Sequence, residues 1–291
     1  MAELKKVVVF GVGLIGGSFA AALKAAGSTA EIVGFGRTIG SLQRAQQLGL
    51  IDSIGVSLGA EVAAADLILL AMPVGQMAEA MARIAPYLQP GCVVTDAGST
   101  KCDVVAAARA AFGARIGQFV PAHPIAGAEN SGPAAARADL FRGRKVVVTP
   151  LAENGPEAVE RVRQAWRRCG ANLFRLTPEE HDRVFAAVSH LPHLLSFALV
   201  NDLAIRDNRE VYFEFAASGF RDFTRIAASD PEMWRDIFFA NRDALLDEID
   251  RYAAQLAAFR RALTDDDAQA LETMLELARC ARRDWGEKGE R

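Results

Sequence analysis

A glycine-rich turn between a short apolar strand and a helix is the feature that most constrains this chain. The turn reads Gly11-Val12-Gly13-Leu14-Ile15-Gly16. The apolar run Lys6–Phe10 before it predicts a buried strand, and Ile15–Ala26 after it predicts an alanine-rich helix. A second strand, Glu31–Phe35, follows soon enough to close a crossover unit. A GxGxxG pattern in this strand–turn–helix context is typical of dinucleotide-binding domains, whereas the pattern alone also occurs in purely structural turns.

Each glycine of this turn has a separate expected role. Gly11 permits the tight turn, Gly13 lets the backbone approach a pyrophosphate, and Gly16 lets the helix pack closely on the strand. Leu14 and Ile15, at the start of the predicted helix, are further candidate cofactor-binding residues. Amide donors that lack a partner within the helix, together with the helix dipole, favour phosphate binding at that end.

Strands and helices alternate through residues 1–176, which predicts an α/β Rossmann-type domain with a doubly wound sheet. Crossover units imply a parallel sheet that is covered on both faces. The expected later strands are Asp66–Ala71, Cys92–Asp96, Phe119–Ala122, Lys145–Thr149 and Asn172–Leu176, and further helices are expected at Ser41–Leu48, Gln76–Tyr87 and Glu157–Cys169.

After Thr177-Pro178 the pattern becomes helical, so residues 177–291 are expected to form an all-helical domain. Apolar residues recur there at three- and four-residue spacing, which is the period of one helix face. They are Ile237, Leu245, Ile249, Tyr252, Leu256, Phe259 and Leu263. So long an apolar stripe must be buried, and we expect it to pack both within its own domain and against a second subunit. The helical domain is therefore predicted to form a homodimer.

The residues after the second strand favour NADP over NAD as the cofactor. An NAD site usually carries an acidic residue about 20 positions after the glycines, bonded to the ribose 2′-hydroxyl. Here the chain reads Gly36-Arg37-Thr38, without a carboxylate. Arg37 can pair with a 2′-phosphate and Thr38 can add a hydroxyl contact. The alternative is that Arg37 is an exposed loop residue and that the cofactor is NAD.

Composition excludes several other classes of protein. A formal net charge of −3 over 291 residues does not favour nucleic-acid binding, which requires clustered Lys and Arg. The four cysteines have no CxxC spacing, so neither a disulfide framework nor a metal site is expected. No signal peptide and no uninterrupted apolar run of membrane length is evident, so we expect a cytoplasmic protein that does not enter a membrane.

Four polar clusters carry the candidate chemistry. Two follow predicted strands, where doubly wound folds bind ligands: Asp96–Lys101 and His123–Glu129. A histidine among glycines at a strand end is a candidate general base, and a structural hydrogen-bonding role is as plausible for it. The other clusters, Ser189–His193 and Gly219–Arg225, lie in the helical half. No second ligand set accompanies His190 and His193, so a metal is not expected.

Taken together, the motifs closely resemble the prephenate/arogenate dehydrogenase family over essentially the whole chain. They are GVGLIGGS (Gly11–Ser18), DAGSTK (Asp96–Lys101), HPIAGAENSG (His123–Gly132), SHLPH (Ser189–His193) and GFRDFTRIAASDPEMWRDI (Gly219–Ile237). Five motifs in the same order are far more specific than any one. The resemblance implies oxidative decarboxylation of a small cyclohexadiene substrate, with hydride transfer to NAD(P), in tyrosine biosynthesis.

The resemblance also implies roles for individual residues. His123 would take the proton of the ring C4 hydroxyl as hydride leaves C4, and Ser99 would orient that hydroxyl or the histidine. Arg225 would hold the ring carboxylate. The remaining residues would bind substrate or cofactor: His193 and His190 at the substrate side chain, Ser189 near the nicotinamide, and Lys101 on the cofactor side of the cleft.

Three alternatives stay open at this point. Prephenate and arogenate differ in a keto or amino group, and Glu129 is a candidate partner for the ammonium. A non-catalytic NADP-binding sensor dimer would explain the glycines and the apolar stripe, but not the clustered Ser99, His123, His193 and Arg225. A 3-hydroxy acid dehydrogenase of similar architecture commonly uses a lysine in the helical half, and no lysine occurs between Lys145 and Lys288.

Overall fold

A computed structural model describes residues 4–127 and 130–289. The chain forms two compact units, Met1–Arg242 and Asp243–Arg291. Within the described residues no strand follows β8 (Asn172–Arg175), so the α/β part ends close to residue 177. The division at 177 between two domains stays a prediction, because the compact units divide the chain much later, after Arg242.

A parallel five-stranded sheet forms the centre of the first unit, as the crossover pattern predicts. Its strand order is β3-β2-β1-β4-β5. The sheet reverses its winding between β1 and β4, and a ligand is expected beyond the carboxyl ends of the strands at that point. The strands are β1 (Lys6–Phe10), β2 (Glu31–Phe35), β3 (Ser53–Ile54), β4 (Leu67–Leu70) and β5 (Val93–Asp96).

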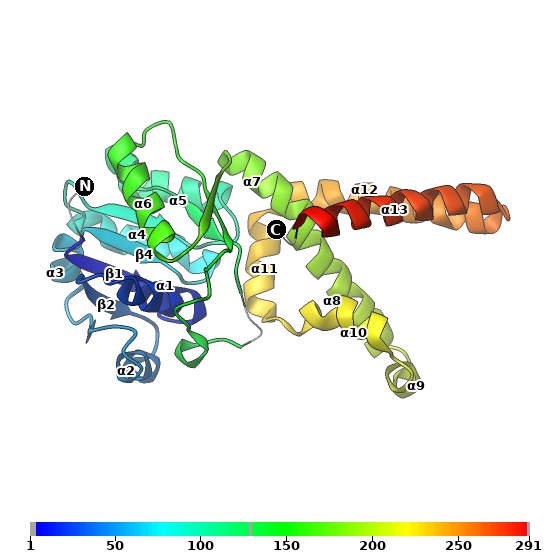
Figure 1. The fold of residues 1–291 in the computed structure, drawn as a ribbon, viewed down its shortest axis with the longest axis horizontal. Coiled ribbons are helices and arrows are strands. Elements are labelled where there is room, and N and C mark those ends of the chain that lie inside the picture. Colours follow the sequence, from blue (N-terminus) through cyan, green and yellow to red (C-terminus); the bar gives the residue numbers. More distant parts are fainter. Residues whose placement is uncertain (1–3, 128–129, 290–291) are drawn as a thin grey trace. The chain divides into compact units, whose positions relative to one another are not determined.

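Helices cover both faces of this sheet, and apolar side chains from the strands fill a core on each side (Figure 1). One core contains Val7, Val9 and the α1 residue Phe19, and the other contains Val8, Ile68 and the α4 residue Met77. Alternate residues of β1 therefore enter opposite cores, as the two-residue period of a strand requires. The helices are α1 (Leu14–Ala25), α2 (Ile39–Gln47), α3 (Leu58–Ala63), α4 (Met77–Ile84), α5 (Cys102–Phe112) and α6 (Pro156–Arg168).

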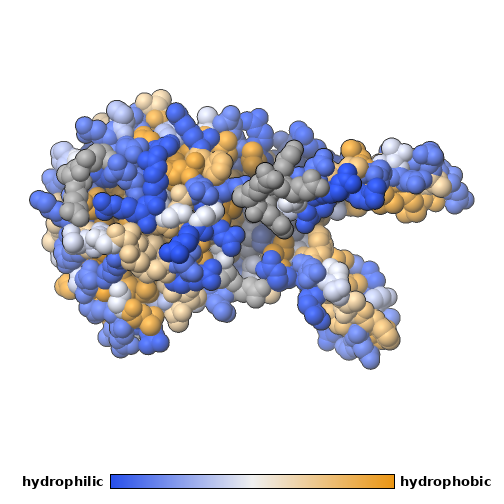
Figure 2. Space-filling model, in the orientation of Figure 1, coloured by the Kyte–Doolittle hydropathy of each residue, from blue (hydrophilic) through white to orange (hydrophobic). Residues whose placement is uncertain are grey.

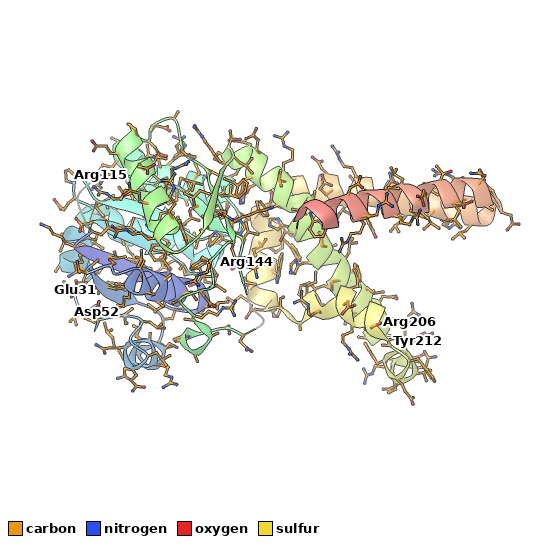
Figure 3. The ribbon with its side chains drawn as sticks, in the orientation of Figure 1. Glu31, Asp52, Arg115, Arg144, Arg206 and Tyr212 are labelled. Carbon is orange, nitrogen blue, oxygen red and sulfur yellow. The ribbon has the colours of Figure 1, made fainter. Side chains whose placement is uncertain are left out.

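The edge of the sheet near β2 is held by Asp52 (Figure 3). Its carboxylate accepts a hydrogen bond from the backbone amide of Ile32 at 2.8 Å and one from Lys24 Nζ at 2.6 Å. Strand β3, which begins at the next residue, is tied to β2 by a hydrogen bond from Ser53 Oγ to Glu31. These contacts fix the start of β2, and hence the position at which its far end delivers Arg37.

The three later strands form a separate sheet that departs from the expected parallel pattern. Its order is β6-β7-β8, from Ala122–Pro124, Lys145–Val148 and Asn172–Arg175. β7 and β8 are parallel, but β6 pairs antiparallel with β7, with His123 opposite Val147. His123 therefore lies within a strand, whereas the sequence pattern placed it after one. An isolated parallel bridge pairs Val94 of β5 with Phe119, which lies three residues before β6.

Helices make up the rest of the first unit. They are α7 (Pro178–Phe185), η5 (Ala186–His190), α8 (Leu191–Ala204), α9 (Arg209–Glu214), α10 (Ser218–Thr224), η6 (Arg225–Ala228) and α11 (Pro231–Ala240). The η5 segment is a π-helix, a form that often marks functional positions. The continuous run Pro178–Ala204 is long and apolar enough to span a membrane by length and composition alone. It carries three of the chain's four histidines and the buried Asp182, as expected of a helix beside a polar site.

The second unit is a pair of long helices, α12 (Arg242–Thr264) and α13 (Ala268–Gly289). Asp267 caps the second of them by accepting a hydrogen bond from the amide of Ala270 at 2.9 Å. Several large apolar side chains of this unit are exposed, among them Tyr252, Leu256, Leu263, Leu275 and Leu277.

Candidate active site

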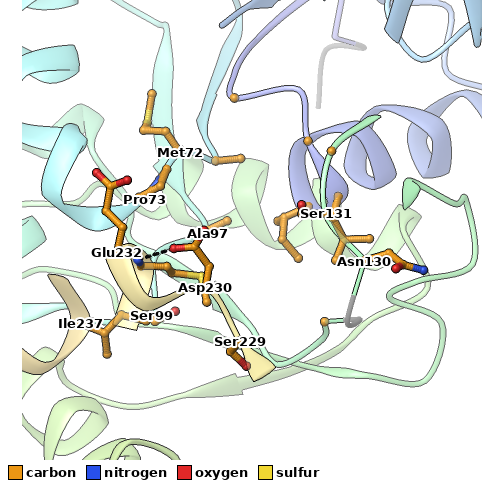
Figure 4. Close-up of a pocket in the computed structure, with 18 of the residues that line it drawn as sticks. Met72, Pro73, Ala97, Ser99, Asn130, Ser131, Ser229, Asp230, Glu232 and Ile237 are labelled. Carbon is orange, nitrogen blue, oxygen red and sulfur yellow. Dashed lines mark hydrogen bonds between the residues drawn. The ribbon is translucent and has the colours of Figure 1, made fainter. Parts of the chain in front are cut away.

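A pocket of about 1940 Å³ opens at the carboxyl ends of the parallel strands. Each strand of the central sheet except β3 contributes the residues that follow it, from Gly11 after β1 to Ser99 after β5. The segment after β6 and helices α8 to α11 complete the lining. Figure 4 shows Ala97 and Ser99 near Asp230 and Ser229, with Asn130 and Ser131 on the opposite side. The volume is sufficient for a dinucleotide together with a small substrate.

The three glycines of the turn have the geometry that their predicted roles require. Gly11 has φ +85°, and a Cβ there would lie 2.7 Å from the carbonyl oxygen of Ala71. A Cβ on Gly16 would lie 2.3 Å from the Gly11 carbonyl oxygen, so helix α1 can approach β1 only without it. A Cβ on Gly13 would meet no atom within 4 Å among the described residues, which leaves the backbone open toward the pocket. These residues fit a dinucleotide pyrophosphate.

The end of β2 presents Arg37 and Thr38 to the same pocket, together with Ser41. Thr38 Oγ1 donates a hydrogen bond to Ser41 Oγ at 2.9 Å. A side chain at Gly36 would meet Leu42 at 3.3 Å. A guanidinium and two hydroxyls form a polar corner here, and the described lining residues between Gly36 and Leu42 include no acidic side chain.

The DAGSTK segment is organised around Asp96, which is fully buried. Its carboxylate accepts hydrogen bonds from the amides of Gly98 (2.8 Å) and Ala122 (3.0 Å) and from Lys101 Nζ. Asp96 thus ties the loop of Ser99 to the strand of His123. The expectation that Lys101 lines the cofactor side of the cleft is wrong. Its side chain is 0 % exposed and forms an ion pair with Asp96 inside the protein, so it does not reach the cleft.

His123 is half-buried on β6, and its ring is held from behind by another histidine. His123 Nδ1 lies 2.8 Å from His181 Nε2. Burial, followed by the charges of His181, Lys101 and His190, holds the pKa of His123 well below its usual range. The imidazole is therefore neutral at physiological pH, as a general base must be. Ser99 is half-buried and lines the pocket, as expected.

His190 does not have the exposure that a substrate-binding residue needs. It is 1 % exposed, and its Nδ1 lies 3.1 Å from the side-chain amide of Asn241. Burial lowers the pKa of His190 to about 4, although a hydrogen bond with the backbone of Ser99 acts in the opposite direction. The polar partners of His190 are therefore Asn241 and the Ser99 backbone, and the prediction that His190 contacts the substrate is wrong. His190 connects the Ser99 loop to α11 through Asn241.

His193 lies one turn further along and lines the pocket. Its Nδ1 donates a hydrogen bond to the carbonyl oxygen of Ser189 at 2.8 Å, and its ring stacks on Trp234 with centroids 3.6 Å apart. Burial and the charge of Arg225 lower the pKa of His193, against the effect of the Ser189 hydrogen bond. A neutral ring that donates through Nδ1 leaves Nε2 as a hydrogen-bond acceptor. Ser189 itself is half-buried and acts here through its backbone.

Arg225 begins the η6 turn and faces the pocket, one helical turn after Arg221, which lines it too. The two place positive charge at the end of the pocket formed by the helices. Glu129, the predicted partner of a substrate ammonium, lies outside the described residues.

Sequence patterns alone missed three residues of this region: His181, Asp182 and Asn241. Adjacent charged residues at the start of a helix are usually solvent-exposed, so the pattern of α7 gave no signal for the first two. One signal was available. The chain has only four histidines, and the structure gathers all of them around this site. Within the described residues no cluster of His, Cys, Asp and Glu could hold a metal ion.

Comparison with known proteins places the chain in a family. Residues 19–175 match the family described as "Prephenate dehydrogenase, nucleotide-binding domain", and residues 177–277 match "Prephenate dehydrogenase, dimerization domain". The cyclohexadienyl dehydrogenase of Zymomonas mobilis subsp. mobilis is 34% identical over 273 residues, which cover 93% of this chain and 92% of the relative.

Solved structures show the same similarity. The prephenate dehydrogenase of A. aeolicus, in complex with hydroxyphenyl propionate and NAD+, has a TM-score of 0.91 at 33% identity, covering 97% of this chain and 99% of that one. The arogenate dehydrogenase of Synechocystis has a TM-score of 0.82 at 28% identity, covering 96% of this chain and 99% of that one.

Proposed function

The chain belongs to the prephenate dehydrogenase family, and from that premise we propose which of its residues carry the reaction. It is an enzyme of tyrosine biosynthesis that oxidatively decarboxylates prephenate or arogenate. The N-terminal domain binds the nicotinamide nucleotide, which accepts a hydride when bound. The family is one of soluble metabolic enzymes.

His123 acts on the C4 hydroxyl of the substrate ring. The C4–H bond breaks and its electron pair leaves as hydride, while His123 Nε2 takes the proton of the C4 oxygen. The bond from C1 to the ring carboxylate then breaks, its electron pair enters the ring, and CO2 departs. His123 returns the proton to the C4 oxygen as the ring becomes aromatic. The observation that supports this assignment is a neutral imidazole on β6, the strand that Asp96 ties to the pocket-lining loop of Ser99.

Arg225 and His193 hold the two ends of the substrate. Arg225 provides a guanidinium suited to the ring carboxylate, and its exposure to the pocket supports that role. His193 presents an acceptor nitrogen toward the substrate side chain, since its Nδ1–H is already bonded to Ser189. An acceptor there suits an ammonium better than a keto oxygen, so arogenate is the favoured partner of this contact.

NADP is the favoured nucleotide. Arg37, Thr38 and Ser41 together offer one charged and two hydroxyl groups at the end of β2, where the 2′-position of the adenosine ribose is bound in this fold. A 2′-phosphate would be paired by the arginine, whereas a 2′-hydroxyl would leave it without that partner.

One assay tests substrate and nucleotide together. The absorbance of reduced nicotinamide is followed while prephenate and arogenate are each combined with NAD and NADP. NADP is expected to give the higher kcat/KM. Arg37→Ala should raise the KM for NADP roughly 10- to 150-fold, since a hydrogen bond to a charged group contributes about 1.5–3 kcal/mol. The KM for NAD should change less than about threefold.

Arg44→Ala, on helix α2 shortly after Arg37, is the matched control, because Arg44 is exposed and is not among the described pocket-lining residues. An Arg37→Ala enzyme that keeps its KM for NADP would overturn the nucleotide assignment. No turnover in any of the four combinations, by protein that binds the nucleotide, would overturn the residue roles above.

A homodimer completes the proposal. The family's C-terminal domain is a dimerization domain. In the second unit, exposed apolar residues recur along α12, and Figure 2 shows hydrophobic surface along one side of this helix pair. A soluble monomer rarely exposes a contiguous apolar patch of such length. These side chains are expected to be covered by a second copy of the chain.

A further inference from the structure

His181 and Asp182 form a hydrogen-bonded chain with His123 behind the pocket. His181 is 0 % exposed, and its Nε2 lies 2.8 Å from His123 Nδ1. Its other ring nitrogen, Nδ1, lies 2.8 Å from Asp182 Oδ1. Both residues come from α7, whereas His123 lies on β6, 58 residues earlier in the sequence. Neither His181 nor Asp182 is among the described residues that line the pocket.

The surroundings of Asp182 determine the direction of every hydrogen bond in this chain. The Asp182 carboxylate accepts from the backbone amides of Lys101 and Cys102, each at 2.8 Å, at the start of helix α5. An ionised carboxylate only accepts, so the proton between Asp182 and His181 belongs to His181 Nδ1. A neutral imidazole has one N–H, which leaves His181 Nε2 as an acceptor. The proton between the histidines therefore belongs to His123 Nδ1, and His123 Nε2 is bare.

The electrostatic environment keeps His181 neutral and Asp182 ionised. Burial lowers the pKa of His181, which keeps its ring neutral despite the neighbouring carboxylate. Burial raises the pKa of Asp182, but hydrogen bonds from His181 and the Cys102 amide outweigh it, and the net shift is downward. The positive end of the α5 dipole also favours the ionised carboxylate. Asp182 is charged and both histidines are neutral.

We propose that His181 and Asp182 are positioning residues that fix the tautomer of His123, so that its unprotonated Nε2 is available to the substrate hydroxyl. This inference rests on the proposed role of His123 as the base. The backbone amides at the start of α5 fix the Asp182 carboxylate, Asp182 fixes the tautomer of His181, and His181 fixes that of His123.

The same arrangement supports His123 after it has taken a proton. Its Nδ1–H then donates to a neutral acceptor whose far side contacts a carboxylate, as in the Ser-His-Asp triad with one additional ring. Phe185 packs against both rings, with centroids 4.9 Å from His123 and 4.4 Å from His181, and shields their contact from water. The charged and titratable groups that influence His123 and His181 are Lys101, Asp96, Asp182 and His190.

The tautomer can be measured directly by long-range 1H–15N correlation NMR of histidine-labelled protein. The chain has only four histidines, so each is assigned by its own substitution. In the wild type, His123 is expected to carry its proton on Nδ1, with Nε2 unprotonated. A bare Nδ1 with a protonated Nε2 would overturn the proposal. The measurement needs neither substrate nor turnover.

Asp182→Asn tests the origin of the tautomer. The substitution removes the negative charge that holds the His181 proton on Nδ1, and its NH2 group takes the place of an oxygen that accepts either from His181 and Lys101 or from Cys102. The single tautomer of both rings is therefore expected to be lost, which should lower kcat by about 10²–10⁴, with little change in KM. His181→Phe, which removes the acceptor, should lower kcat to a similar extent. His181→Gln keeps an acceptor oxygen and should recover at least about tenfold of that loss.

Glu179→Gln is the matched control, because it removes an exposed carboxylate from the same helix without touching the chain of hydrogen bonds. Circular dichroism and nucleotide affinity show whether each variant is folded. An unchanged tautomer and unchanged kcat in Asp182→Asn would overturn the inference. Failure of the base assignment itself is distinguishable, since it would appear as full turnover in His123→Asn while the wild-type NMR result stands.

Discussion

Arg225 illustrates how a single side chain can bind a substrate without taking part in its chemistry. The carboxylate that it holds is the group that departs as CO2, so an excessively strong contact would oppose the reaction. Arg225→Ala is therefore expected to raise the KM for prephenate or arogenate roughly 10- to 150-fold, the equivalent of one charge-assisted contact, while kcat changes less than about threefold.

Steady-state kinetics with saturating nucleotide measures this effect. Arg235→Ala is the matched control, because Arg235 is exposed, pairs with Asp236 at 2.7 Å and is not among the described pocket-lining residues. A kcat that falls as steeply as kcat/KM would contradict the assignment of Arg225 to binding.

Residues whose role depends on local backbone geometry could be predicted from the sequence. Gly11 and Gly16 are examples, because a tight turn and a close strand–helix contact are encoded within a few residues. Residues whose role depends on distant partners could not. Lys101 and His190 were expected to reach ligands, but packing buries the first beside Asp96 and the second beside Asn241. His181 contacts His123 although the two are 58 residues apart in the sequence, and a local sequence pattern cannot predict such a contact.

At the scale of elements, hydrophobic periodicity predicted the strands of the central sheet well. β1 and β2 begin and end where their apolar runs do, because strands buried on both faces are continuously apolar. The short β3 and the helices α3 and α5 were missed, since a two-residue strand and alanine-rich segments carry little pattern. The antiparallel pairing of β6 was also missed. It depends on how the chain returns to the sheet, and the sequence of β6 itself is compatible with either direction.

The π-helical turn η5 is the element on which the site depends most. It lies between α7, which carries His181, and α8, which carries His193. An extra residue in one turn changes the angle at which the next side chains project. Here it allows His190 to face the buried Asn241 while His193 faces the pocket. Periodicity analysis assumes a regular helix, so it could not anticipate that the two histidines have different environments.

At the scale of the whole molecule, the apolar surface of α12 predicts assembly. Light scattering of the purified chain is expected to give twice the mass of one 31.2 kDa chain. Leu256→Asp places a charge on a residue that is 54% exposed, and it should shift the protein toward the single-chain mass because a buried unpaired charge is costly. Arg251→Asp, on another side of the same helix, is the control and should leave the mass unchanged. A wild-type protein with the mass of one chain would contradict the homodimer.

The pH dependence of kcat in the wild type and in His123→Asn tests whether His123 is the base. Because burial holds the pKa of His123 below its usual value of about 6.5, the neutral base persists as the pH falls. The acid limb of the wild-type profile is therefore expected below that value. His123→Asn should lose about 10²–10⁴ in kcat with little change in KM, and it should lose this limb as well. Turnover in His123→Asn like that of the wild type, with the same acid limb, would show that another group takes the proton.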